Sequence, residues 1–226
     1  EHGGLDHLII SEVDRFDGSS HCRVRVWRGA LSASGFTRLR GDDPDGELLD
    51  LGPELYAAIP GAQHLVGWLS SWAVARRMTW PGFAGGPISL PRKVVWRAER
   101  LRVEPDPGVC ALFTVPSQGA PSAGLGRAVI DGAQAFTLDL IGAGASLRVG
   151  LDPALGTIAV RRNGPPPFAW DGLHRGVVTP APQRRLQLFI DGPVVELFIE
   201  PEGRSLSAVL PIAPDGLDVV LRSAGQ

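Results

Sequence analysis

The residues best suited to chemistry lie between positions 50 and 72. Two acids, Asp50 and Glu54, precede Tyr56, and two tryptophans follow at Trp68 and Trp72. Carboxylates accept hydrogen bonds from sugar hydroxyls, and flat aromatic rings stack on the apolar face of a sugar ring. This spacing suggests a carbohydrate site. The same residues also suit a bland role, with the aromatics in a core and the acids capping turns.

A nearby acidic stretch, residues 42–46, supplies one candidate nucleophile, Asp43. Its sequence, D-D-P-D-G, has the Asp, Pro and Gly content of a surface turn. We therefore favour a turn over a nucleophile at Asp43.

Other site chemistries find little support. The five histidines are scattered, and Cys22 and Cys110 lie far apart without a C-x-x-C spacing, so we predict no metal site. No glycine-rich phosphate motif follows a strand and opens a helix, so we predict no cofactor. We expect two buried or idle thiols, and the sequence leaves a disulfide between them open.

Composition narrows the class of protein. The chain has 226 residues, with 22 Lys and Arg against 24 Asp and Glu, and the basic residues form no stripe that could bind nucleic acid. No apolar run approaches the roughly 18 residues of a membrane span. The 29 glycines and 20 prolines are too many for a helix-rich protein. These features predict a loop-rich, all-β chain without nucleic acid or membrane partners, and they leave its localisation open.

Alternating apolar and polar residues predict strands in the first half of the chain. Residues 21–27 alternate strictly, and 7–11 form a second short strand joined to them by a turn at 17–20. Short apolar runs at 65–69 and 87–90 have the length of further strands. Such spacing is typical of propeller blades or of the layers of a sandwich.

The pattern changes after a Pro- and Gly-rich stretch at 103–121, which we interpret as a junction. No apolar set keeps a helical period over three turns, so no substantial helix is expected. The spacing of the strands predicted beyond the junction suits a sandwich. They cover residues 136–140, 146–149, 157–160, 186–190 and 194–199, and Asp191-Gly192 makes a hairpin of the last two.

Four segments in order resemble glycoside hydrolase family 32, the β-fructofuranosidases that include invertases, levanases and inulinases. The family patterns are D-x-G-x-D-F-Y-A, G-W-M-x-N-W, G-x-M-S-L-P-R-E-L and a final hairpin with V-D-x-S-S-V-E-V-F. The matching segments are 50–57 (D-L-G-P-E-L-Y-A), 67–72 (G-W-L-S-S-W), 86–92 (G-P-I-S-L-P-R) and 186–199 (L-Q-L-F-I-D-G-P-V-V-E-L-F-I).

The resemblance implies a five-bladed β-propeller followed by a C-terminal β-sandwich. At about 40–50 residues per blade, residues 1–102 would supply the last two blades, and residues 103–226 would form the sandwich. Since a propeller needs at least about four blades to close, the resemblance implies an N-terminal propeller segment or a companion chain as partner. The other implied partner is a fructose-containing saccharide.

Carried over residue by residue, the resemblance makes Asp50, Glu54, Tyr56, Trp68 and Trp72 the expected substrate-binding residues. The chain departs from the family at several of these positions. Glu54 stands where the family has Asp, Leu55 where it has Phe, Ser71 where it has Asn, and Lys93 where it has Glu. These departures bear on activity more than on fold.

The family's catalytic motifs, W-M-N-D-P-N-G, R-D-P and E-C, do not occur in this sequence. A retaining glycosidase needs two carboxyl groups, a nucleophile and an acid/base, about 5–5.5 Å apart. We therefore expect the nucleophile and the acid/base to lie outside this chain, upstream of Glu1, and the chain alone to be inactive.

Two alternatives stay open at this point. The chain could be a non-catalytic carbohydrate-binding or assembly module derived from the family. It could also be a small enzyme in its own right that uses Asp43 or Asp50 with a distant glutamate.

Overall fold

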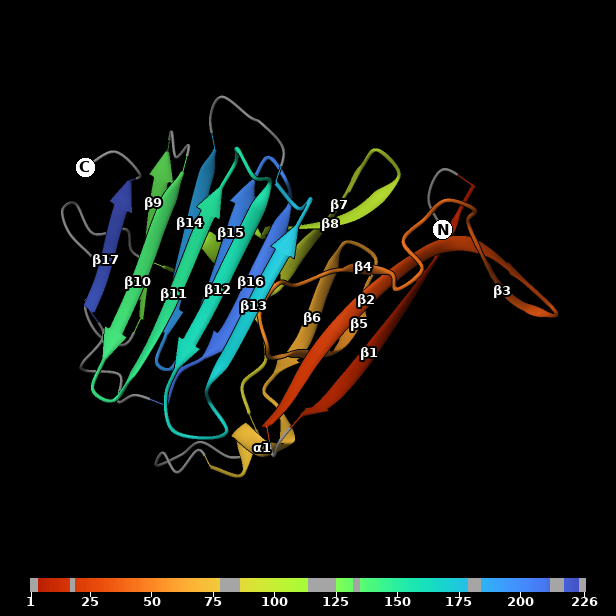
Figure 1. The fold of residues 1–226 in the computed structure, drawn as a ribbon. Coiled ribbons are helices and arrows are strands. Elements are labelled where there is room, and N and C mark those ends of the chain that lie inside the picture. The colour runs from red at the N-terminus through yellow and green to blue at the C-terminus, as the bar shows by residue number, and fades with distance from the viewer. Residues whose placement is uncertain are drawn as a thin grey trace.

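The computed structural model describes residues 4–16, 19–77, 86–113, 125–131, 135–178, 184–211 and 218–223. These residues form four antiparallel sheets and two helices of one turn each (Figure 1). The all-β prediction is confirmed, and the sheets have the size and pairing of propeller blades. Part of the predicted 17–20 turn and residues 114–121 of the predicted junction lie outside the described residues.

The first two sheets follow one another along the chain. In the first, β2 pairs with β1, β3 and β4; the second has the order β5-β6-β7-β8. Their strands are β1 (Asp6–Phe16), β2 (Ser19–Ser32), β3 (Gly35–Arg38), β4 (Glu47–Leu48), β5 (Leu55–Pro60), β6 (His64–Leu69), β7 (Arg92–Arg97) and β8 (Arg100–Pro105).

The third and fourth sheets come from the rest of the chain. The third has the order β13-β12-β11-β10-β17, and the fourth has the order β16-β15-β14-β9. Their strands are β9 (Leu125–Asp131), β10 (Phe136–Gly142), β11 (Ala145–Asp152), β12 (Thr157–Asn163), β13 (Trp170–Arg175), β14 (Arg185–Asp191), β15 (Val194–Glu200), β16 (Arg204–Val209) and β17 (Asp218–Ser223). The helices are α1 (Trp72–Ala75) and α2 (Pro107–Cys110).

The third and fourth sheets enclose the largest core between them. Alternate residues of β11, from Ala145 to Leu151, point into this core, and Arg148 between them points out. Leu188 and Leu197 fill it from the fourth sheet. This alternation explains why β11 could be predicted from the sequence.

The fourth sheet is buried on both of its faces. Every residue of β16 is buried, and all of β15 except Glu200 is buried as well. One face meets the third sheet, whereas Val194 and Val209 on the other face join a core with Leu65 and Val103 of the second sheet. The fourth sheet thus lies between the third sheet and the second sheet.

One sequence expectation is wrong, and another is confirmed. The run 87–90, expected as a strand, forms only an isolated bridge between Ile88 and Trp68, because Pro87 and Pro91 have no N–H to donate to a ladder. As expected of buried or idle thiols, Cys22 lies in the core and Cys110 is half-buried on α2, and no disulfide joins them.

Candidate functional site

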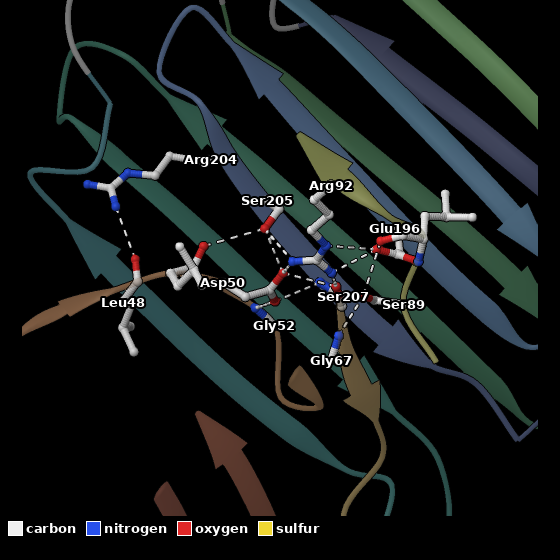
Figure 2. A network of polar contacts seen from close by, with 12 residues as sticks. Leu48, Asp50, Gly52, Gly67, Ser89, Arg92, Glu196, Arg204, Ser205 and Ser207 are labelled. Carbon is white, nitrogen blue, oxygen red and sulfur yellow. Dashed lines mark hydrogen bonds and ion pairs between the residues drawn. The ribbon is translucent and has the colours of Figure 1, made fainter. Parts of the chain in front are cut away.

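The Asp50 carboxylate lies at the centre of a buried polar network (Figure 2). Its Oδ2 accepts hydrogen bonds from Arg92 Nη1 at 2.8 Å, Ser205 Oγ at 2.7 Å and Ser207 Oγ at 2.9 Å. Its Oδ1 accepts from the backbone N–H groups of Gly52 and Ser207, both at 2.9 Å. The Asp50 carboxylate therefore accepts five hydrogen bonds.

Arg92, at the start of β7, connects Asp50 to a second carboxylate, Glu196 of β15. Arg92 Nη2 lies 2.7 Å from Glu196 Oε2, and Glu196 Oε1 accepts from the Leu90 N–H at 2.7 Å. The Arg92 side chain is 0% exposed, and the two acidic side chains are each 1% exposed. One buried guanidinium is thus shared between two buried carboxylates, one from each half of the chain.

Burial and pairing shift the pKa values of this network in different directions. Burial raises the pKa of the Asp50 carboxyl, but Arg92, the two serine hydroxyls and the Gly52 N–H together lower it below its ordinary value. Burial raises the pKa of Glu196, and the neighbouring Asp50 charge adds to this, so its pKa stays above the ordinary value in spite of Arg92. Burial lowers the pKa of Arg92, but Glu196 and Asp50 more than compensate, so it stays charged.

The loop between β4 and β5 reaches this network because its backbone runs directly beside β16. Asp50 forms a parallel bridge with Ser205, and the Leu51 N–H donates to the Ser205 carbonyl at 2.8 Å. A Cβ at Gly52 would lie 1.9 Å from the Ser207 carbonyl oxygen, so only glycine permits this approach. The glycine of the 50–57 segment therefore has a packing role.

Glu54 makes a second buried ion pair at the end of the same loop. Its Oε1 lies 2.5 Å from Arg162 Nη1, and its Oε2 accepts from the Val209 N–H at 3.0 Å. Both charged side chains are 1% exposed. Burial raises the pKa of Glu54 and outweighs the opposing effect of Arg162.

The three predicted aromatic residues, Tyr56, Trp68 and Trp72, form one group that we call the aromatic cluster. Tyr56 and Trp68 are paired across β5 and β6 with ring centroids 6.1 Å apart, and the Trp68 and Trp72 centroids are 5.2 Å apart. Trp72 is 55% exposed. The cluster thus offers an aromatic surface to solvent, as a saccharide site requires.

Two local features hold the tryptophans in place. The Ser71 hydroxyl caps α1 by accepting from the Val74 N–H at 3.2 Å, which fixes Trp72 as the first helical residue. Gly86 packs against the Trp68 indole, where a Cβ would lie 2.2 Å from Trp68 Nε1.

Asp43 lies in an exposed turn, as the sequence favoured. Its Oδ1 accepts from the Asp45 N–H at 2.9 Å, and its carbonyl accepts from the Gly46 N–H at 3.0 Å. The neighbouring Asp42 pairs with Arg28. This geometry is that of an Asp-stabilised turn.

The structure thus brings the three aromatic residues together and turns the two acids away to partners on other sheets. Direct binding of a sugar by Asp50 or Glu54 stays a prediction, and it would require displacing the donors that occupy their carboxylates. The sequence reasoning did not assign a role to Arg92 or Arg162. Glu196, an acid on the strand predicted at 194–199, is buried and has a structural role in the ion pair with Arg92.

No metal site is apparent in this part of the chain. Among the described residues, no group of three or more His, Cys, Asp or Glu side chains is arranged to hold a metal ion. None of the helices formed by those residues is long and apolar enough to cross a membrane.

Sequence comparisons find no relative. No protein-family model matches the chain, and no curated protein is significantly similar to it.

Solved structures, in contrast, are similar over nearly the whole chain. The GH32 β-fructofuranosidase of Bombyx mori aligns with 99% of the chain at 21% identity and a TM-score of 0.65, over 52% of its own length. The sucrose-6-phosphate hydrolase of Lactobacillus gasseri aligns with 99% at 15% identity and a TM-score of 0.65, over 62% of its own length. The exo-inulinase of Aspergillus awamori aligns with 99% at 17% identity and a TM-score of 0.60, over 55% of its own length.

This similarity establishes the fold. The chain has the all-β fold of about half of a GH32 β-fructofuranosidase, and the resemblance inferred from the four motifs is confirmed at that level.

Proposed function

We propose that this chain is the saccharide-binding and structural part of a retaining β-fructofuranosidase that acts on sucrose or fructans. The observation that carries this proposal is the alignment of 99% of the chain with the Bombyx mori β-fructofuranosidase. A mutant of that enzyme was solved in complex with sucrose. The order of the four motifs along the sequence supports the same conclusion.

The aromatic cluster is the proposed contact surface for the sugar. Its Trp72 ring is more than half exposed and packs against Trp68, so the two rings present a broad apolar surface to a furanose or pyranose ring. Asp50 and Glu54 support the proposed site, because their ion pairs fix the loop that leads into Tyr56.

Residues 1–102 correspond in this proposal to the last two blades of a five-bladed propeller, and residues 103–226 to a β-sandwich. The support for the blades is that the first two sheets each have four antiparallel strands. The support for the sandwich is the core shared by the third and fourth sheets. Strand β8 runs on to Pro105, so the boundary would fall just after this strand.

An N-terminal propeller segment or a companion chain is the proposed partner of this half. Strands β1 and β5 each lie at the end of their sheet and offer an edge for pairing. Leu8 and Ile10 on β1 are 36% and 40% exposed, and Ile59 on β5 is 67% exposed. Exposed apolar side chains on these strands suit packing against a neighbouring blade.

The nucleophile and the acid/base belong, in this proposal, to that partner. They would flank the scissile bond about 5–5.5 Å apart, one attacking the anomeric carbon and the other protonating the leaving oxygen. The second candidate is a non-catalytic carbohydrate-binding module. The observation that favours it is that Asp50 and Glu54, the acids of the candidate site, are both paired with buried arginines.

Titration with fructose, followed through the tryptophan indole N–H signals by NMR, tests the proposed contact surface. The chain has six tryptophans, and we expect saturable shifts in the signals of Trp68 and Trp72. The signals of Trp27 and Trp96, which lie on other strands, serve as internal controls and should stay in place. Absence of any saturable shift, or shifts confined to the control signals, would remove the aromatic cluster from the site.

A further inference from the structure

We propose that Glu54 is a positioning residue for the aromatic cluster and sets the geometry of that cluster against the third and fourth sheets. The inference rests on the proposed function only for its saccharide readout. Its basis is that the backbone of Glu54 connects to the aromatic cluster, whereas the side chain of Glu54 bonds to the third and fourth sheets.

The backbone of Glu54 connects to both ends of the aromatic cluster. Tyr56 follows it by two residues at the start of β5. The Glu54 carbonyl accepts from the Ser70 N–H at 3.1 Å, and the next residue, Ser71, caps the helix that begins with Trp72. A shift of the Glu54 backbone would therefore move Tyr56 and Trp72 together.

The carboxylate of Glu54 is hydrogen-bonded to residues of two strands, β16 and β12. One oxygen receives the backbone N–H of Val209 at the end of β16, and the other receives the Arg162 guanidinium from β12. Arg162 is itself held, because it donates to the carbonyls of Phe168 and Val209 and its guanidinium carbon lies 5.8 Å from the Phe168 ring centroid. Arg162, the partner of the Glu54 carboxylate, therefore has little freedom to move.

The contacts of the Glu54 side chain require two acceptor oxygens, and not only a side chain of this size. A carboxylate accepts both the Val209 N–H and the Arg162 N–H, whereas an amide of the same shape would turn an NH2 group toward one of these donors. Because both side chains are 1% exposed, water has little access to repair the mismatch. Replacement by glutamine should therefore displace the loop rather than leave it unchanged.

The decisive experiment compares the near-UV circular dichroism and the fructose affinity of wild type and Glu54→Gln. We expect the aromatic signal of the variant to fall about twofold and its Kd for fructose to rise about tenfold, while far-UV dichroism and cooperative unfolding are retained. A residue that only stabilised the fold would lower the unfolding midpoint and leave the native aromatic signal and the Kd unchanged. Asp171→Asn is the matched control. It removes the exposed ion pair between Asp171 on β13 and Arg161, the residue next to Arg162 on β12, and should leave both readouts at wild-type values.

Wild-type aromatic dichroism and affinity in a folded Glu54→Gln protein would overturn the inference. Should that variant fail to fold, Glu54→Asp keeps the carboxylate on a shorter side chain, and Arg162→Lys keeps the positive charge but removes the planar guanidinium donors. Loss of the aromatic signal in these variants supports positioning, and its full retention in both overturns it. Failure of the wild-type chain to bind fructose would instead reject the proposed function, and the dichroism would still decide the role of Glu54.

Discussion

Replacing Arg92 by methionine is expected to lower the free energy of unfolding by about 3 to 5 kcal/mol. The substitution leaves Asp50 and Glu196, both 1% exposed, without their shared counter-charge. It also removes donors to Ser205 and Ser207, so the contact between the second and fourth sheets loses most of its polar partners. Urea denaturation followed by far-UV circular dichroism measures the change.

Arg97→Met is the matched control, because it is the same substitution on the same strand. Arg97 is 48% exposed and pairs with Glu104, so its removal should cost less than about 1 kcal/mol. A loss of similar size in the two variants would show that the buried network contributes no more than a surface ion pair.

The two carboxylates that share Arg92 should respond to pH in opposite ways. The pKa of Asp50 is lowered, so the stability from its charge is present at neutral pH and is lost as pH falls through the folded-state pKa, below the ordinary value of 3.8. The pKa of Glu196 is raised, so the folded state favours its protonated form. The stability from that form is present below the ordinary pKa of 4.5 and is lost as pH rises through the folded-state pKa. Asp50→Asn should therefore destabilise more than Glu196→Gln at neutral pH, and the difference should shrink in acid.

Replacing Trp72 by alanine is expected to weaken fructose binding about tenfold while lowering the free energy of unfolding by less than about 1 kcal/mol. The ring is 55% exposed, so its removal opens no core cavity, but it takes away half of the tryptophan pair offered to the sugar. Isothermal titration calorimetry gives the Kd, and thermal unfolding gives the stability.

Ile59→Ala supplies the control for this comparison. Ile59 is also apolar and exposed, at 67%, and lies on β5 beyond the aromatic cluster. Its replacement should leave the Kd for fructose unchanged. Equal affinities for wild type and Trp72→Ala would exclude the Trp72 ring from sugar binding.

Eight of the seventeen described strands could be predicted from the sequence, and β11 shows why, because its burial is one-sided. Residues 146–149 alternate between core and solvent, and that alternation is visible in the chain itself. Strands such as β4, with two residues, carry no such pattern, and their pairing depends on partners elsewhere in the fold.

The candidate site was predictable in its residue types and less so in its partners. The aromatic cluster follows from β-strand pairing of two segments that were both recognised. Asp50 pairs with Arg92, which also pairs with Glu196, and Glu54 pairs with Arg162; these partners are distant in sequence, and no local pattern connects them. A signal for Glu196 was nevertheless present, because residues 194–199 are apolar on both sides of it, as in a strand buried on two faces.

Sucrose hydrolysis, measured as released fructose, tests the central claim most directly. The 226-residue chain alone should release none, and the same chain produced together with the coding sequence upstream of Glu1 should release fructose with retention at the anomeric carbon. Measurable turnover by the 226-residue chain alone would contradict the proposal that its nucleophile and acid/base lie elsewhere. Absence of turnover in the extended protein would contradict the proposal that an N-terminal propeller segment supplies the nucleophile and the acid/base.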